Sequence, residues 1–403
     1  MRRIAIISTM MLLALSCKKV FAPIAVSSPD SYLVIEGVIN SGSDSTYFRL
    51  SRTVKLSAKD TVKFEDNAAV SIEGSDNTSY QLNETVNGVY ATPALGLSPT
   101  AKYRLRVKTA NNEEYLSDYV ETKSTPPIDS ITYTVENDGV QFYVTTHDPA
   151  NATRYYRWDF EETWGYLAFE QSFYKIGTDG LPEYRTDPAD KFYECFKTVP
   201  SQQVLLGNSL KLAQDVVDKQ PLDFITAESG KISHGYSVLF HQYALTQDAY
   251  TYWQQLKKNT ETIGSIFDAQ PSEVASNIHC ISDPSQAAIG YISASTVTAQ
   301  RIFVDARSTV VVTPGYLPPP TPDDCTSPPV AGQIWINPED TFLVRLQQLT
   351  YTGNTLLIAA ITDRPTGKLI GYTYSSRECT DCLAKAPYGT NAVPAFWPAG
   401  YHY

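Results

Sequence analysis

The chain has 403 residues, of which 42% are hydrophobic and 19% are charged, and its formal net charge at pH 7 is −11. This length predicts two or three domains, and the hydrophobic content is enough to bury large cores and argues against an intrinsically disordered chain. The acidic balance argues against nucleic acid as a partner, because such binding needs clustered Lys and Arg. With 27 Tyr, 25 Pro and 21 Gly, the composition favours a mainly β protein with many turns.

The N-terminus has the features of a lipoprotein signal peptide. Two Arg precede a short apolar run, which ends at Ser16-Cys17. The run is shorter than the roughly 20 apolar residues that span a membrane, and the pattern is typical of a secretory signal. A Cys directly after small residues resembles the lipobox of bacterial lipoproteins, in which the peptide is cut before the Cys and the Cys carries the lipid. We expect residues 1–16 to be the signal peptide and Cys17 to be lipidated; the alternative is ordinary secretion with a free Cys17 thiol.

A first β domain is predicted after a tether over residues 17–31. About seven short β-rich runs, separated by Asn, Asp, Gly and Pro, fill residues 32–125, and Tyr103-Arg104-Leu105-Arg106-Val107 alternates strictly. This pattern predicts an independently folding β-sandwich of the Ig-like or transthyretin-like kind. Thr125-Pro126-Pro127 then predicts a domain hinge, because consecutive Pro residues disfavour helix and strand pairing.

Residues 126–403 predict a second, larger β-rich domain, a fibronectin III-like sandwich. An aromatic strand carries Tyr156, Trp158 and Phe160 at every second position, which indicates one buried face. The irregular stretch over about residues 165–220 predicts an insertion. One helix is expected over about residues 246–259, with Thr246 as its cap.

Five cysteines follow Cys17, and export to an oxidising compartment makes disulfides the default. The Cys379-Thr380-Asp381-Cys382 motif has three interpretations: a redox pair, a zinc site completed by Cys280 and Cys325, or structural disulfides that pin the tail. Nearby Pro residues argue against the redox pair, and the wide separations argue against zinc. We therefore expect disulfides among Cys280, Cys325, Cys379 and Cys382, and no metal and no cofactor.

No sequence pattern identifies catalytic residues. His279 and Cys280 are adjacent on a predicted strand and point to opposite faces, so they are poorly placed as a nucleophile pair. Asp159, Glu161 and Glu162 follow the aromatic strand, and the first two would share a face, which suits acid/base work or, more commonly, a solvated strand face. The chain lacks GxSxG, HExxH, a Walker loop and a Rossmann glycine triplet. We therefore expect a protein that is not an enzyme.

Aromatic side chains of the predicted insertion are the candidate binding residues. Tyr166, Phe169 and Tyr174 lie in an irregular stretch with no periodic face to bury them. Large aromatics on a loop supply contact area for a partner or ligand. The alternative is that the insertion folds back and these side chains fill a satellite core.

The order of segments resembles the domain of unknown function 4249 family, lipoproteins of Gram-negative bacteria of the Bacteroidota type. The segments that carry the resemblance are, in chain order, Leu33-Val34-Ile35-Glu36-Gly37, Asn87-Gly88-Val89-Tyr90, Pro127-Ile128-Asp129-Ser130-Ile131, Arg154-Tyr155-Tyr156-Arg157-Trp158, Tyr252-Trp253-Gln254-Gln255-Leu256, Gly264-Ser265-Ile266-Phe267-Asp268-Ala269-Gln270-Pro271, Asn277-Ile278, Ile289-Gly290-Tyr291, Arg301-Ile302-Phe303, Cys379-Thr380-Asp381-Cys382 and Phe396-Trp397-Pro398. The resemblance implies an outer-membrane lipoprotein, often encoded near TonB-dependent receptors, and it implies no reaction.

Three functions follow from these observations. The first is a non-enzymatic accessory or ligand-binding lipoprotein, which works with a TonB-dependent transport system and takes a peptide or glycan ligand. The second is a structural or adhesion module, and the third is an envelope hydrolase that uses the carboxylates near Asp159. In each case the chain would be anchored to the outer membrane by its lipid, on the periplasmic face or on the cell surface.

Overall fold

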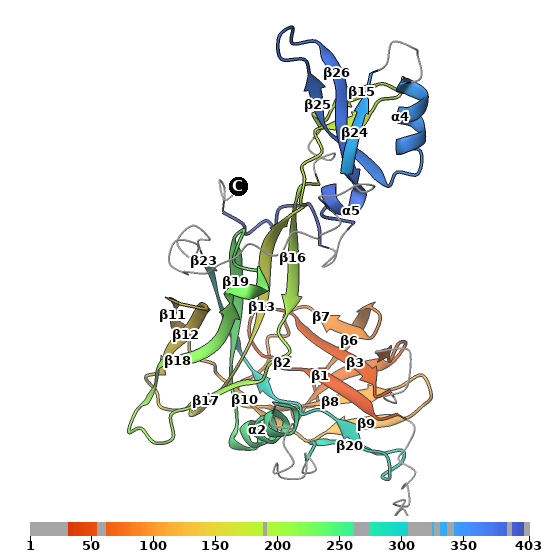
Figure 1. The fold of residues 1–403 in the computed structure, drawn as a ribbon. Helices are drawn as coiled ribbons and strands as arrows, with labels where there is room; N and C mark the ends of the chain where they lie inside the picture. The colour runs from red at the N-terminus through yellow and green to blue at the C-terminus, as the bar shows by residue number, and fades with distance from the viewer. Residues whose placement is uncertain are drawn as a thin grey trace, which may run out of the picture.

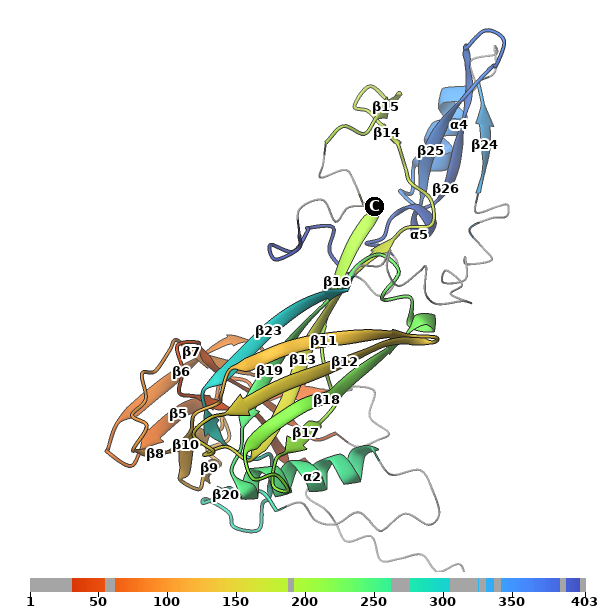
Figure 2. The ribbon, with the colours of Figure 1, turned by 90° about the vertical axis from the view of Figure 1, so that its left-hand side faces the viewer.

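The structure is a computed structural model that describes residues 31–54, 62–187, 192–261, 275–304, 325, 331–336, 342–384 and 389–398. The predicted signal peptide, Cys17 and nearly all of the predicted tether lie outside these residues. The chain is mainly β, as predicted, and its strands form a first sandwich, a second sandwich and a smaller distal lobe (Figures 1 and 2). No helix in the described ranges is both long and apolar enough to cross a bilayer.

The first sandwich is built mostly from the short β-rich runs of the N-terminal segment. Its core side chains alternate along the strands, as Tyr103, Leu105 and Val107 do on β8, because successive strand residues face opposite sides. The strands are β1 (Leu33–Gly37), β2 (Ile39–Asn40), β3 (Thr46–Arg52), β4 (Lys63–Phe64), β5 (Ala69–Gly74), β6 (Ser79–Val86), β7 (Val89–Thr92), β8 (Lys102–Lys108), β9 (Glu114–Ser117), β10 (Val120–Lys123), β20 (Ile278–Cys280), β21 (Ala288–Ile289) and β22 (Ala294–Ser295).

The last three of these strands correct the expected boundary at residue 125. β20 pairs with β9, β21 pairs with β1, and β22 lies between β2 and β10. Their side chains Ile278, Cys280, Ala288 and Ala294, together with Ile292, are part of the buried core of the first sandwich. The first sandwich is therefore completed by a segment about 150 residues further along the chain, and residues 32–125 are only part of it.

The second sandwich packs a three-stranded sheet against a five-stranded sheet. The predicted aromatic strand is β13, and its Tyr156, Trp158 and Phe160 all face the core between the sheets. The strands are β11 (Ile128–Glu136), β12 (Gly139–Asp148) and β18 (Asp215–Thr226) in one sheet, and β13 (Tyr155–Leu167), β16 (Glu194–Pro200), β17 (Leu205–Asn208), β19 (Tyr236–Ala244) and β23 (Val297–Val304) in the other. A short 3-10 helix, η2 (Ala227–Ser229), follows β18.

Helix α2 (Gln247–Glu261) corresponds to the predicted helix and begins beside its predicted cap. The Thr246 hydroxyl accepts a hydrogen bond from the Ala249 N–H at 3.2 Å, which satisfies one of the unpaired donors of the first turn. Figure 2 shows α2 below the second sandwich, near β17.

The segment Thr125-Pro126-Pro127, the predicted hinge, is bound to the second sandwich by buried hydrogen bonds. The fully buried Gln242 amide donates to the Pro126 carbonyl (2.9 Å) and to the Thr146 hydroxyl (3.0 Å), and it accepts from the Trp158 indole N–H (2.9 Å). The Thr125 hydroxyl accepts from the Ala244 N–H at 3.0 Å. Bending within this segment would break several of these buried hydrogen bonds, each worth about 1 kcal/mol, so we infer that the segment stays attached to the second sandwich.

The predicted insertion over residues 165–220 is divided between two bodies. Residues 194–220 contribute β16, β17 and part of β18 to the second sandwich, whereas β14 (Tyr174–Ile176) and β15 (Pro182–Tyr184) belong to the distal lobe. In the lobe they join β24 (Ala331–Trp335), β25 (Thr355–Thr362) and β26 (Leu369–Ser376) in one sheet. The lobe also contains α4 (Phe342–Thr350) and α5 (Arg377–Thr380), which the expectation of a single helix did not include.

The distal lobe has its own small core. Ile334, Leu346, Leu357 and Tyr372 are buried together, and the Tyr174 ring packs edge-on against Tyr372 with ring centroids 5.2 Å apart. Figures 1 and 2 both show the lobe extending away from the end of the second sandwich that carries β16. Its surfaces are therefore reachable without moving either sandwich.

Candidate functional surface

The three carboxylates after the aromatic strand are held by different partners. Asp159 accepts from His241 Nδ1 (3.0 Å) and Arg157 Nη2 (3.1 Å), on the outer face of β13 and β19. Burial alone would raise the pKa of Asp159, but the hydrogen bond from His241 and the charge of Arg157 outweigh it and lower the pKa below its ordinary value. The Arg157 guanidinium is in turn stacked between two rings, 4.3 Å from the centroid of Tyr243 and 4.4 Å from that of Trp253.

The other two carboxylates are paired as well. Glu161 shares the outer face with Asp159, as predicted, and lies 3.8 Å from Arg301 Nη2. Glu162 points to the buried side, where it pairs with Lys231 and accepts from the Tyr236 hydroxyl at 3.1 Å. Each carboxylate is thus neutralised by its own base, an arrangement that stabilises the sandwich and does not present an acid and a base across an open cleft. The hydrolase alternative stays a prediction.

Asp223 is a buried carboxyl with little compensation. It is 5% exposed, and its side chain accepts hydrogen bonds from Gln203 Nε2 at 2.9 Å and from the Phe224 N–H. Burial raises the pKa of Asp223 above its ordinary value. The hydrogen bond from Gln203 opposes this shift only in part, and the nearby charge of Glu162 adds to it. The folded protein therefore holds this carboxylate at a cost in stability.

The exchange Asp223→Asn is expected to raise the free energy of unfolding by roughly 1–2 kcal/mol at pH 7. The pKa of Asp223 is higher in the folded protein than its ordinary value of 3.8. The wild-type carboxyl therefore lowers the stability of the fold increasingly as the pH rises from 3.8 through the folded-state pKa. The gain should therefore shrink as the pH falls towards 4, which urea unfolding at the two pH values measures. The exposed Asp218→Asn control should change stability by less than about 0.5 kcal/mol at either pH. A destabilised Asp223→Asn variant at pH 7 would contradict this account.

The candidate binding aromatics lie at the base and in the core of the distal lobe. The half-buried Tyr166 donates to the Cys382 carbonyl (3.1 Å) and accepts from the Gly389 N–H (2.8 Å). Tyr174 packs in the distal core. Phe169, which lies between these two tyrosines in the sequence, is half-buried. For Tyr166 and Tyr174 these contacts favour the alternative of a satellite core over a binding surface.

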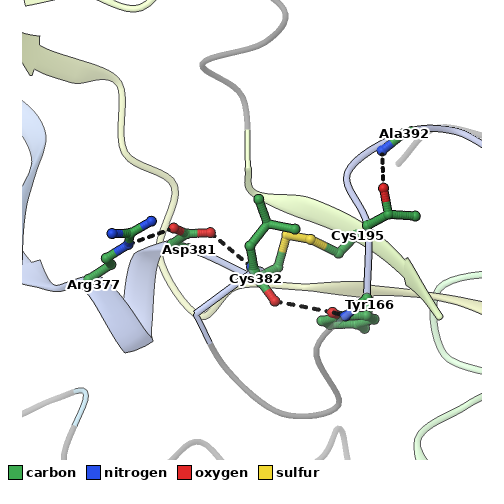
Figure 3. Close-up of a disulfide and its surroundings, with 9 residues drawn as sticks. Tyr166, Cys195, Arg377, Asp381, Cys382 and Ala392 are labelled. Atoms are coloured by element: carbon green, nitrogen blue, oxygen red, sulfur yellow. Dashed lines mark hydrogen bonds and ion pairs between the residues drawn. A yellow bond between two sulfur atoms is a disulfide. The ribbon is translucent and has the colours of Figure 1, made fainter.

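Two disulfides meet at α5, and one of them ties the lobe to the second sandwich. Cys379 on α5 bonds to Cys325, and Cys382 just after α5 bonds to Cys195 on β16. Figure 3 shows the second bond with the Tyr166 hydroxyl beside it. The buried Asp381 accepts from Arg377 Nε at 2.9 Å and from the Leu383 N–H at 2.8 Å, so the turn between the two disulfides is itself fixed.

Three of the four cysteines that were predicted to form disulfides do so, and the prediction for the fourth is wrong. Cys280 is a buried free thiol in the core of the first sandwich, and Cys195, which sequence reasoning left out, takes a place in the disulfide set. Both cysteines lie on strands, so the local sequence pattern did not show which of them would form a disulfide. The redox-pair and zinc interpretations are wrong, because Cys379 and Cys382 are each bonded to a distant cysteine and not to each other. His279 is exposed while Cys280 is buried, as expected for neighbours on a strand.

The distal lobe carries a surface of exposed apolar side chains. On α4, Leu343 and Val344 are 41% and 54% exposed, and on and after β24, Trp335 and Ile336 are 48% and 39% exposed. Leu369 at the start of β26 lies close by, since the Ile336 N–H donates to the Ile370 carbonyl. Ile334 faces the core that α4 covers, so Trp335 lies on the opposite face of the sheet. We call these five residues, which are spread over both faces of the lobe, the distal apolar surface.

A small pocket lies instead at the junction of the two sandwiches. It is lined by Val120, Thr246, Tyr291 and Ile292, among others, and it encloses about 10 Å³. That volume holds about one water molecule, so this pocket does not suit a peptide or glycan. Ligand capture is better served by an exposed surface than by this pocket. Within the described ranges, no three His, Cys, Asp or Glu side chains are placed to hold a metal ion.

Comparison with solved structures finds distant matches. Two fibronectin type III domains of chicken tenascin match over 53% of this chain and 91% of that chain, with 9% identity and a TM-score of 0.16. An elastase-activated α2-macroglobulin of Escherichia coli matches over 54% of this chain and 19% of that chain, with 14% identity and a TM-score of 0.18. Likenesses this distant carry no argument, and the fold rests on the strand order above. No curated protein matches the chain.

Residues 19–301 match the model of the domain of unknown function DUF4249. The chain belongs to this family. The match covers both sandwiches and β14–β15, and it ends within β23, before β24 of the distal lobe.

Proposed function

We propose that the protein is a non-enzymatic lipoprotein of the cell envelope that serves an outer-membrane, TonB-dependent transport system as an accessory or ligand-binding partner. Lipid on Cys17 would anchor it to the outer membrane of a Bacteroidota-type bacterium, on the periplasmic face or on the cell surface. The N-terminal sequence supports the anchor, and the family resemblance supports the membrane and the partner. A peptide or a glycan is the proposed ligand class.

The observation that carries the binding role is the distal apolar surface. Its side chains stand on a lobe that both views show clear of the sandwiches, and two disulfides fix that lobe. A lobe that served only as a spacer would gain nothing from exposing Trp335, Leu343 and Val344, whereas a contact surface gains apolar area to bury, worth about 25 cal/mol per Å². A structural or adhesion role is the second candidate, and the presence of two tandem β-sandwiches favours it, because such modules can act as spacers.

The proposal is tested on full-length protein expressed in its native host. Replacement Cys17→Ser should move the protein from the outer-membrane fraction to the soluble fraction. The double exchange Leu343→Ser with Val344→Ser should leave the membrane association intact and reduce capture of the transporter after mild detergent extraction. An equal membrane fraction for Cys17→Ser would contradict the anchor, and this outcome is separate from the result on capture.

A further inference from the structure

The sheet of the distal lobe ends in two edge strands of opposite character. Its strand order is β15-β14-β25-β26-β24, so β15 and β24 are its edges. β15 has three residues and contains Pro182 and Glu183, and Pro, charge and short length all hinder pairing with another strand. β24 has five residues, Ala331–Trp335, with neither Pro nor charge. Only β24 lacks the features that protect an edge.

Among the described residues, the outer backbone groups of β24 have no partner. The Ile336 N–H donates to the Ile370 carbonyl of β26, and backbone direction alternates along a strand, so the groups of Ala331, Gln333 and Trp335 point away from the sheet. Within the described part of the chain, these three residues make no further hydrogen bond. Figure 2 shows β24 as the outermost strand of the lobe, on the side away from the sandwiches.

We propose that β24 pairs with β24 of a second copy of this chain, antiparallel, about a two-fold axis through Gln333. In this register every outward residue meets an outward residue: Gln333 faces Gln333 of the second copy, and Trp335 faces Ala331 of the second copy. Both strands thereby satisfy their free N–H and carbonyl groups, and the two five-stranded sheets become one continuous sheet.

The side chains of β24 fit this pairing with themselves. The strand is small at one end, with Ala331 and Gly332, and large at the other, with the half-exposed Trp335. An antiparallel pair places each indole over the small end of the other strand, which leaves room for the ring and buries part of it. No charge meets a like charge across the axis. A strand that is complementary to itself suits a second copy of the chain. A strand of an unrelated partner would need small residues opposite Trp335 and could be large opposite Ala331.

The contact is small and the dimer is accordingly weak. A single strand pair with two indoles falls in the class of interfaces below about 1,200 Å², so we expect dissociation constants of roughly 10 µM to 1 mM in solution. Attachment of many copies to one surface would raise their effective concentration towards the millimolar range. The pairing itself requires neither a lipid nor a transporter, so it can be measured on the soluble protein that starts after Cys17.

Sedimentation velocity of this protein across about 10 µM to 1 mM tests the pairing. Wild type should shift from monomer to dimer with concentration. Gln333→Lys and Gln333→Glu should each remain monomeric, because like charges would face each other across the axis, and an equimolar mixture of the two should dimerise again. Trp335→Ala should weaken dimerisation about tenfold, while Tyr351→Ala, which removes a 90% exposed ring elsewhere on the lobe, should leave it unchanged.

A wild type that stays monomeric over the whole range would overturn the proposal. Dimers that persist in both single charge variants would also overturn it, because the contact would then lie away from Gln333. If wild type is monomeric and Gln333→Lys loses captured transporter, the β24 edge receives a strand of another protein and the second copy is excluded. Circular dichroism of each variant separates these results from misfolding.

Discussion

A fragment of residues 31–125 is expected to remain unfolded in isolation. It lacks β20, β21 and β22, which pair with β9, β1, β2 and β10. Five core side chains are lost with them: Ile278, Cys280, Ala288, Ile292 and Ala294. The two isoleucines alone account for about 3–6 kcal/mol of apolar burial, which is comparable with the stability of about 5–15 kcal/mol that a domain of this size normally has.

The fragment is compared with the full chain after Cys17 by far-ultraviolet circular dichroism and thermal melting. The full chain should melt cooperatively with a β-type spectrum, whereas the fragment should show a coil spectrum and no transition. Adding residues 275–296 to the fragment through a flexible linker should restore the transition, because it returns all three strands. A cooperative melt of the unaided fragment would show that the first sandwich needs no later segment.

The second large effect is expected from removal of the Cys195–Cys382 disulfide. This bond joins residues separated by 187 positions, and the chain-entropy model assigns about 3–5 kcal/mol to a crosslink that closes so long a loop. The double exchange Cys195→Ala with Cys382→Ala should therefore destabilise the attachment of the distal lobe. We expect faster proteolysis after α5 and faster amide hydrogen exchange over β16, with β8 in the first sandwich unaffected.

The matched control is Cys280→Ala, which removes a free, buried thiol and closes no loop. Its effect should be about 1 kcal/mol. Thiol titration of the denatured, unreduced protein that starts after Cys17 should find one free thiol, that of Cys280. Three or more free thiols, or a double variant as stable as the control, would contradict the assigned pairs.

Sequence reasoning worked where a local pattern decides the structure. Strict alternation from Tyr103 to Val107 gave β8, aromatic residues at every second position gave the inner face of β13, and the Thr246 hydroxyl does cap α2. In each case the period of the side chains or one capping contact is sufficient, and no distant residue is needed.

Such local patterns do not predict which distant segments pair with each other. β21 and β22 have two residues each, too few to show a period, and their place is set by contact with β1, β2 and β10. The distal lobe joins Tyr174 to Leu357 across more than 180 residues, so its aromatics looked unpaired in sequence. The same reason hid the distal apolar surface, because exposure of Leu343 depends on which side of α4 the sheet covers. Cys195 was missed because the choice of its partner is also made by the tertiary fold.

Capture of the outer-membrane transporter by the distal apolar surface tests the central claim most directly. Tagged wild type and two double variants are extracted from native membranes, and the co-purified transporter is quantified by mass spectrometry. Leu343→Ser with Val344→Ser should reduce capture at least about tenfold, whereas Leu210→Ser with Leu212→Ser, two leucines of similar exposure on a loop of the second sandwich, should leave it at the wild-type level. Equal capture by wild type and the Leu343/Val344 variant, with both folded and membrane-bound, would contradict the claim that the distal lobe is the binding element.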